Sequence, residues 1–197
     1  MSLFPLFLKL AGRKVLVVGG GAVAAAKVAA LREADARISL VAPDIAPSLL
    51  ELAAAGKISI ARRSFDASDL EGAWLVVAAS TSEVNRGVAV AAESRRLFVL
   101  AVDDPSAASA YGAGTLRRGG VTVAVSTDGR APALAGLLRE GLEAVLPDDL
   151  EAWSGAAERA RLAWRAAGVP MADRRPLLLR ALNDLYDARA KNDKVPR

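Results

Sequence analysis

The chain has 197 residues, of which 53% are hydrophobic and 24% are charged, a composition typical of globular rather than disordered proteins. It contains no cysteine, which excludes disulfides and thiolate metal sites. It also contains no histidine, so the commonest general base and transition-metal ligand is missing, and we expect no metal site. Carboxylates, hydroxyls and lysines remain for acid–base chemistry.

The formal net charge of +4 fits a nucleic-acid partner, an acidic small substrate, or simply a basic surface. No helix-turn-helix, zinc-finger or RNP pattern occurs in the sequence, so we expect no nucleic-acid partner. The first ten residues are apolar with one lysine, but they are too few to span a membrane and lack the layout of a signal peptide. We therefore expect a cytoplasmic protein without a membrane partner.

The strongest motif follows the first predicted strand, the apolar run Lys14–Val18. A glycine triplet ends this strand, and an alanine-rich helix is predicted over 22–34. Gly19, Gly21 and Ala24 match the G-x-G-x-x-G/A dinucleotide fingerprint in the context that it requires, after a strand and at the start of a helix. The alternative is a glycine-rich turn that binds no ligand.

Each small residue of the fingerprint has a physical role. Gly19 permits the tight turn, Gly21 lets the backbone approach a pyrophosphate, and Ala24 allows the helix to lie close to its strand. The free N–H groups and the positive dipole end of the helix then face the phosphates. We therefore expect a dinucleotide cofactor to contact Gly19, Gly20, Gly21 and Ala24.

The second predicted strand, Arg37–Val41, is followed by Ala42, Pro43 and Asp44. An acidic residue at this strand end normally binds the ribose hydroxyls of the cofactor. Asp44 is the candidate, although it is displaced past a proline. Neither an arginine nor a lysine stands at this strand end, so a 2′-phosphate has no evident partner. The sequence therefore favours NAD over NADP.

The segments that follow alternate between predicted strands and helices. In chain order we expect a helix over 45–55, an edge strand over 57–61, a central strand over 73–79, a helix over 83–95 and a strand over 97–102. This order predicts an α/β fold of the Rossmann type, a doubly wound parallel sheet with right-handed crossovers.

Ligands of such sheets bind at the carboxyl ends of the strands. We therefore expect four segments to line one crevice, and they are Gly19–Ala24, Ala42–Asp44, Ala78–Thr81 and Asp103–Pro105. Ala79 and Ser80 are thereby predicted to contact the cofactor as well.

The composition changes near residue 106. Residues 107–120 are rich in glycine and alanine, a strand is predicted over 121–125, and a helix begins at Pro132 and stops before Pro147. The apolar stripe of this helix fits a subunit interface or packing within the chain, and its residues are Leu134, Leu137, Leu138, Leu142 and Val145.

Two further helices are predicted over 149–168 and 173–190. We therefore expect three regions, which are an NAD-binding Rossmann domain over 1–106, a small α+β dimerisation and substrate region over 107–147, and a C-terminal helical region over 148–197.

Several stretches together resemble one family. They are FPLFLKLAGRKVLVVGGGAVAAAK, LVAPD, VVAAST with Asn85, AESRR before a strand that ends in VDDP, and AVSTDGRAPALAGLLRE. The chain is similar to precorrin-2 dehydrogenase, the NAD-dependent dehydrogenase module of siroheme synthase, closely over residues 4–146. Because no methyltransferase domain is present in this sequence, it resembles the stand-alone form.

The resemblance implies the oxidation of precorrin-2, a partly reduced tetrapyrrole, to sirohydrochlorin with NAD, by a homodimer. Some members of the family also insert ferrous iron to give siroheme, which the sequence leaves open here. The resemblance places the essential aspartate of the family on Asp103, its backbone cofactor contacts on Ala22, Val23, Pro43 and Asp44, and its phosphorylatable serine on Thr127, beside Ser126.

Two features depart from the family pattern. The asparagine that often lies three residues before the essential aspartate is Leu100, and the aromatic-rich segment after it reads Ala110-Tyr111-Gly112-Ala113-Gly114. Both departures concern the shape of the substrate pocket more than the reaction.

The residues themselves fit this chemistry. Dehydrogenation needs a hydride acceptor and a group that manages the released proton, and without histidine a carboxylate at a strand end is the best base. Asp103 fits this role better than Asp104, which precedes a proline and is expected to cap the turn. Ser126 and Thr127 are candidates for substrate binding, or for capping the helix that begins near Pro132.

Precorrin-2 is rich in carboxylate side arms, and a guanidinium binds carboxylates in a bidentate manner. The candidate cations are Arg117, Arg118, Arg130 and Arg139. Two other functions remain open. A non-catalytic NAD(H)-sensing module would need an attached effector segment, and an NAD dehydrogenase of another small acidic substrate usually brings a histidine or lysine as its acid–base group.

Overall fold

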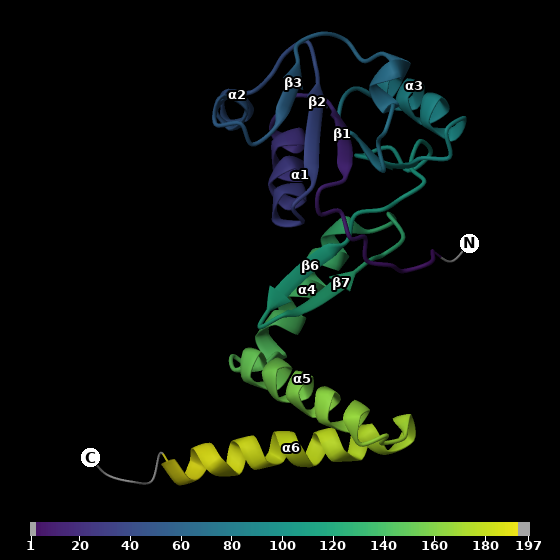
Figure 1. Cartoon of the computed structure of the whole chain (residues 1–197). Coiled ribbons are helices and arrows are strands. Elements are labelled where there is room, and N and C mark those ends of the chain that lie inside the picture. Colours follow the sequence, from purple (N-terminus) through teal and green to yellow (C-terminus); the bar gives the residue numbers. More distant parts are fainter. Residues whose placement is uncertain (1–2, 193–197) are drawn as a thin grey trace. The chain divides into compact units, whose positions relative to one another are not determined.

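The computed structural model describes residues 3–192, and side chains are described over residues 3–186. The chain divides into two units. The first contains the chain up to Gly112 together with Asp128–Arg130, and the second contains Ala113–Thr127 and the chain from Ala131 onward. Figure 1 shows the elements of both units along the chain. No helix in the described residues is both long and apolar enough to cross a membrane.

A five-stranded parallel sheet organises the first unit, in the strand order β3-β2-β1-β4-β5. Its strands are β1 (Lys14–Val18), β2 (Arg37–Val41), β3 (Ser59–Ala61), β4 (Leu75–Ala78) and β5 (Phe98–Ala101). Every neighbouring pair is parallel, and Val17 of β1 lies level with Leu40 and Val77. The predicted parallel sheet is confirmed, and each predicted strand agrees with the observed one to within two residues at either end.

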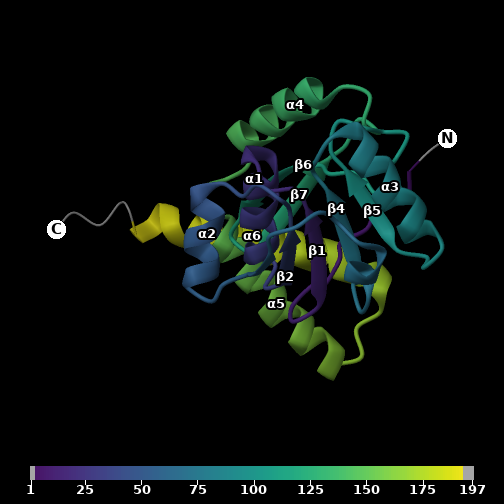
Figure 2. The same cartoon turned by 90° about the horizontal axis from the view of Figure 1, so that it is seen from above.

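Helices cover both faces of this sheet. The helices α1 (Ala22–Glu33) and α2 (Pro47–Ala54) pack on one face, and α3 (Ser82–Glu93) packs on the other. Figure 1 and the view from above in Figure 2 both show α1 and α3 on opposite sides of β1. A short 3₁₀ helix, η1 (Ala67–Leu70), precedes β4. This arrangement is the doubly wound fold that the order of elements predicts.

The alternation of side chains along β1 explains the two layers of helices. Val17 is fully buried in one core with Val28 of α1, whereas its neighbour Val18 is buried in the other core with Val88 of α3. A strand that is apolar at successive positions can be covered on both faces, as central strands of parallel sheets are. Each such side chain contributes about 1.5–3 kcal/mol on burial.

The loop after β5 closes the outer edge of the sheet. The N–H groups of Ser109 and Ala110 both donate to the carbonyl oxygen of Val99, at 2.9 Å each. The Ser109 hydroxyl in turn accepts the N–H of Val99 at 2.8 Å. Both backbone groups of this edge-strand residue are thereby satisfied, and the loop is held against β5.

The second unit begins with an antiparallel hairpin of β6 (Gly114–Arg118) and β7 (Val121–Val125). The strand predicted over 121–125 is confirmed. The sequence analysis does not predict β6, because Leu116 is the one apolar residue in GTLRR and no alternating pattern results. Gly119 and Gly120 form the turn with φ of 53° and 78°, as a two-residue type I′ hairpin requires.

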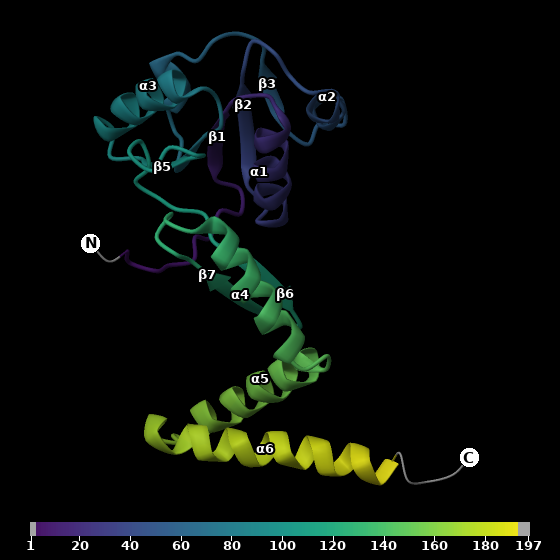
Figure 3. The same cartoon turned by 180° about the vertical axis from the view of Figure 1, so that it is seen from behind.

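Three helices complete the second unit, and they are α4 (Pro132–Val145), α5 (Leu150–Ala166) and α6 (Met171–Asn192). Figure 3 shows α4 alongside the hairpin. Gly114 permits this contact, because a Cβ there would lie 3.1 Å from the carbonyl oxygen of Ala135 in α4. The rings of Trp153 and Tyr186 join α5 and α6 in a T-shaped contact with centroids 5.9 Å apart. All three helices agree with prediction to within two residues at either end.

Candidate functional site

The glycine triplet brings three strand ends of the first unit together. Gly19 has a φ of 124°, and a Cβ there would overlap the carbonyl oxygen of Ala79 after β4. A Cβ on Gly20 would overlap the carbonyl oxygen of Asp44 after β2. These two glycines are therefore required by close approach of the backbone, whereas a Cβ on Gly21 would meet nothing within 4 Å. Gly21 thus borders the open space that a ligand can enter.

The start of α1 is suited to an anion. Gly21 is its N-cap residue, no side chain caps the helix, and its first turn contains no acidic residue. The first N–H groups of a helix have no partner within the helix. At the start of α1 they belong to Ala22, Val23 and Ala24, beside the open space at Gly21. The residues present therefore fit the pyrophosphate of a dinucleotide.

The ribose end of the predicted cofactor site differs from expectation in one respect. Pro43 and Asp44 are exposed after β2, as a ribose contact requires. The sequence analysis places no cation at this strand end, but the Nε of Arg62 donates to the carbonyl oxygen of Pro43 at 3.3 Å. Arg62 follows β3, which pairs with β2, so this neighbour arises from sheet pairing rather than from the local sequence. The sequence favours NAD on the premise that no cation lies at this strand end, and the position of Arg62 shows that this premise is wrong.

Asn85 joins the ends of β4 and β5. It is the one polar residue that is buried in the part of the chain that the structure describes, with an exposed fraction of 1%. Its Oδ1 accepts the N–H of Ser80 at 3.1 Å. Its Nδ2 donates to the carbonyl oxygens of Ser80 at 3.3 Å and of Val102 at 3.4 Å. One side-chain amide thereby fixes the backbone after both strands.

Asp103 follows Val102 at the carboxyl end of β5 and is exposed. Its φ of 57° is unusual for a residue with a side chain. Two of the other such residues, Asp35 and Arg96, lie just after helices, where this conformation is a common way to end a helix. Asp103 follows a strand, so a helix end does not explain its positive φ. Strained backbone of this kind is frequent at functional sites.

The surroundings of Asp103 hold its backbone and leave its carboxylate available. The N–H of Val102 donates to the carbonyl oxygen of Ala78 at 2.9 Å, and the carbonyl oxygen of Val102 accepts from Asn85. No hydrogen bond or ion pair within the described residues engages the Asp103 carboxylate. The carboxylate can therefore accept a proton from a ligand at the strand ends.

The neighbouring Asp104 is occupied by its own turn, as expected. Its Oδ1 accepts the hydroxyl of Ser106 and the N–H of Ala107, and its Oδ2 lies 3.8 Å from Nε of Arg86. The hydrogen bond from Ser106 is the largest cause that lowers the pKa of the Asp104 carboxyl below its usual value. A carboxylate that is harder to protonate is the poorer base, so Asp104 is a structural residue.

Tyr111 joins the turn after Asp103 to the short loop 128–130. Its hydroxyl donates to the carbonyl oxygen of Pro105 at 3.2 Å. Its ring lies against Gly129, where a Cβ would be 2.8 Å from Cε1. Arg130 in this loop has an 81% exposed side chain and lies 3.6 Å from Asp128. From the sequence alone, Tyr111 is only a departure from a family pattern, because the residues that it contacts are distant in sequence.

The remaining predicted substrate residues, Arg117, Ser126 and Thr127, belong to the second unit. The Thr127 hydroxyl accepts the N–H of Ala131 at 3.1 Å. Ala131 is itself the N-cap residue of α4 and no side chain caps this helix, so the expected alternative, that Ser126 or Thr127 caps it, is wrong. Substrate binding by these three residues stays a prediction.

Two of the candidate arginines are already paired within the second unit. Arg118 donates to the carbonyl oxygen of Leu146 at 2.8 Å and lies 3.4 Å from Asp148. Arg139 forms ion pairs with Glu143 at 2.8 Å and with Glu140 at 3.2 Å. Their charges are thus partly neutralised by neighbouring carboxylates.

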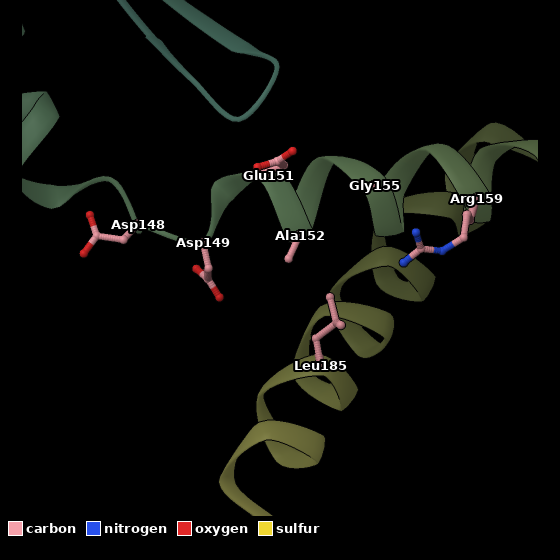
Figure 4. Close-up of a pocket in the computed structure, with 7 residues that line it drawn as sticks. All are labelled: Asp148, Asp149, Glu151, Ala152, Gly155, Arg159 and Leu185. Carbon is pink, nitrogen blue, oxygen red and sulfur yellow. The ribbon is translucent and has the colours of Figure 1, made fainter. Parts of the chain in front are cut away.

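A pocket in the second unit is lined by none of the residues that the sequence analysis assigns to the site. Figure 4 shows its lining, which is Asp148, Asp149, Glu151, Ala152, Gly155, Arg159 and Leu185. Within the described residues, no group of three or more acidic side chains is arranged to hold a metal ion. The candidate site therefore remains the strand ends of the first unit.

Two family models match the chain. The model described as putative NAD(P)-binding matches residues 6–113, and the model described as sirohaem biosynthesis protein central matches residues 118–144. The first spans the whole parallel sheet and more than half of the chain. The dinucleotide fingerprint and the strand ends described above all lie within it.

Curated relatives match over nearly the whole chain. Siroheme synthase 3 of Aeromonas hydrophila subsp. hydrophila is 41% identical over 198 residues, covering 99% of this chain and 42% of the relative. Siroheme synthase of Neisseria meningitidis serogroup C is 39% identical over 196 residues, covering 99% of this chain and 41% of the relative. The chain thus spans about two fifths of the length of these relatives. The solved structure of SirC, a precorrin-2 dehydrogenase, matches with a TM-score of 0.75 at 26% identity, covering 93% of this chain and 92% of that one.

The cofactor site is tested by Gly21→Asp, which places a carboxylate in the open space at the start of α1. We expect the affinity for NAD to fall at least about tenfold, because the charge opposes the pyrophosphate, while the protein still folds. The measurement is calorimetric titration with NAD. Gly87→Asp is the matched control, since Gly87 is exposed in α3 and a Cβ there also meets nothing within 4 Å. NAD binding by Gly21→Asp equal to that of Gly87→Asp would reject the site.

The role of Asn85 is tested by Asn85→Ala, which leaves backbone groups of Ser80 and Val102 without their partner. We expect the free energy of unfolding to fall by about 1–3 kcal/mol. We also expect the Ser80 N–H to lose protection against hydrogen exchange beyond this global change. The control is Val88→Ala, which opens a cavity on the same helix without removing a hydrogen bond. Equal local protection of Ser80 in both variants would mean that Asn85 acts only as a core residue.

Proposed function

Because the chain belongs to the putative NAD(P)-binding family and is homologous over nearly its whole length to part of the siroheme synthases, we propose that it oxidises precorrin-2 to sirohydrochlorin with NAD. The likeness to the SirC precorrin-2 dehydrogenase over both units supports this reaction. The observation that carries the proposal is Asp103, an exposed carboxylate in a strained backbone conformation at the strand ends of an NAD(P)-binding sheet.

The oxidation removes one hydride and one proton from precorrin-2. Bound NAD supplies the hydride acceptor. The carboxylate of Asp103 accepts the proton, since no described residue forms a hydrogen bond or ion pair with this carboxylate. The hydrogen bonds of Val102 with Asn85 and Ala78 hold the backbone next to Asp103 in place. Asp104 takes no part, because its carboxylate is occupied by Ser106 and Ala107.

The start of α1 holds the pyrophosphate, and Asp44 accepts hydrogen bonds from the ribose hydroxyls. Asp44 is exposed after β2, and its carbonyl oxygen faces Gly20, so the ribose end and the phosphate end of the site are adjacent. Arg62 binds the Pro43 carbonyl beside them and orients this segment. A free carboxylate at this point favours NAD, whose ribose carries two hydroxyls, over NADP.

The substrate side includes the turn after Asp103 and the loop 128–130, which both belong to the first unit. Tyr111 connects that turn to Gly129, which places Arg130 within the first unit. Its exposed guanidinium suits a substrate carboxylate. Ser126, Thr127 and Arg117 belong to the second unit, and substrate binding by them stays a prediction from the sequence.

We also propose that the protein is a homodimer that associates through α4. Leu137 and Val145 of its apolar stripe are 65% and 74% exposed, and Leu134, Leu138 and Leu142 are also exposed. A contiguous apolar stripe of this kind is typical of a protein interface.

The interface is tested by Leu137→Asp, which places a charge on the apolar stripe. We expect the wild-type protein to sediment as a dimer at micromolar concentration and the variant to sediment as a monomer. Leu162→Asp is the control, because Leu162 is 70% exposed but lies on α5. A wild-type monomer in sedimentation equilibrium, or a dimer that survives Leu137→Asp, would contradict this assignment.

The base is tested by Asp103→Asn, which keeps the shape of the side chain and removes its basicity. We expect the turnover number for sirohydrochlorin formation to fall by about 10²–10⁴-fold, with NAD affinity unchanged. The matched variant Asp104→Asn should lose less than about tenfold, since that carboxylate serves the turn. Near-normal turnover in Asp103→Asn would assign the proton transfer to water or to the substrate itself.

A further inference from the structure

Lys27 on α1 differs in burial or contacts from each of the other lysines whose side chains the structure describes. Lys9 and Lys57 are exposed, whereas Lys14 and Lys27 are half-buried. The Lys14 ammonium donates to the carbonyl oxygens of Asp69 at 2.9 Å and of Glu71 at 2.7 Å. No hydrogen bond or ion pair joins the Lys27 ammonium to any described residue. Because the residue is only half-buried, this ammonium group is accessible and available to an anion.

The ammonium of Lys27 lies close to Gly112. A Cβ on Gly112 would lie 3.5 Å from Nζ of Lys27 and 3.8 Å from Cδ1 of Leu100. The charged end therefore lies beside the chain segment that closes the β5 side of the sheet.

This segment leads directly to Asp103. Gly112 follows Tyr111, whose hydroxyl is bonded to Pro105 in the turn after Asp103. Leu100 belongs to β5, the strand that ends just before Asp103. Lys27 is thus linked through these residues to the part of the site where the substrate is oxidised.

The direction of the side chain agrees with this position. Side chains on a helix lean toward its N-terminus, so Lys27 covers the turn of α1 that contains Val23 and Ala24. That turn lies at the carboxyl ends of the strands, where ligands of a parallel sheet bind.

The anion that best fits Lys27 belongs to the substrate rather than to the cofactor. The pyrophosphate is served by the N–H groups at the start of α1, beside the end of β1. The Lys27 ammonium lies near Leu100 of β5, which is separated from β1 by β4. Arg118 and Arg139, which the sequence analysis offers for the substrate carboxylates, are already paired with Glu143 and other carboxylates of their own unit.

We propose that Lys27 binds a carboxylate side arm of the tetrapyrrole on the β5 side of the site. The inference rests on the proposed dehydrogenase function and adds to it a substrate contact from the cofactor-binding helix. An ammonium group is a compact point charge with three donors, which suits a single carboxylate arm. The contact acts on binding and leaves the proton transfer to Asp103.

The test replaces Lys27 by methionine, which keeps the apolar stem and removes the charge. We expect the KM for precorrin-2 to rise about 10- to 100-fold, the range of one lost charge-assisted hydrogen bond, with kcat and the KM for NAD changed less than about twofold. Titration with sirohydrochlorin in the absence of NAD should show the same loss of affinity. Lys27→Arg should restore most of it, and the exposed Lys57→Met is the matched control.

Unchanged affinity of Lys27→Met for both tetrapyrroles, in a wild-type background that oxidises precorrin-2, overturns this inference and leaves the proposed function standing. A raised KM for NAD with unchanged tetrapyrrole affinity also overturns it, because it assigns the lysine to a cofactor phosphate. A wild-type protein that does not oxidise precorrin-2 refutes the proposed function, and the inference with it.

Discussion

The amide of Asn85 is the interaction on which the site depends. By bonding to Ser80 and to Val102 it joins the ends of β4 and β5 beyond their last paired residues, Ala78 and Ala101. It adds to the backbone hydrogen bond from Val102 to Ala78. A buried amide is tolerated because the backbone groups satisfy it, and leaving those groups unpaired would be costly. The backbone next to Asp103 is thereby held where its positive φ can persist.

On the cofactor side, close approach of the backbone also holds strand ends together. Gly19 lies against Ala79 and Gly20 against Asp44, so the ends of β1, β2 and β4 meet with no side chain between them. The glycine that remains, Gly21, faces open space at the uncapped start of α1. Gly19 and Gly20 therefore bring the strand ends together, and Gly21 leaves the open space in which we propose that the phosphates bind. The fold and the binding site arise from the same three residues.

Local patterns predict the first unit well because its elements are encoded locally. The apolar run of β1, the glycine turn and the alanine-rich α1 each have a strong pattern, and the order of elements then implies the parallel sheet. Contacts between residues far apart in sequence are not predictable in this way. Arg62 contacts Pro43 because β3 pairs with β2. Tyr111 contacts Gly129, although the residues of the hairpin lie between them in the sequence. The strand β6 is not predicted, because its one apolar residue, Leu116, cannot form an alternating apolar and polar pattern.

The chemistry of the site follows from what the chain lacks as well as from what it contains. The chain has no histidine, and we propose that the proton passes to a carboxylate. The structure distinguishes Asp103, which has no partner among the described residues, from Asp104, whose carboxylate accepts a hydrogen bond from Ser106. The central claim is that this carboxylate and NAD together oxidise precorrin-2. The most direct measurement is to mix the purified protein with precorrin-2 and NAD without oxygen and to follow the visible spectrum. We predict that sirohydrochlorin and NADH appear in equal amounts. If the protein binds NAD but the spectrum of precorrin-2 does not change, the claim is contradicted.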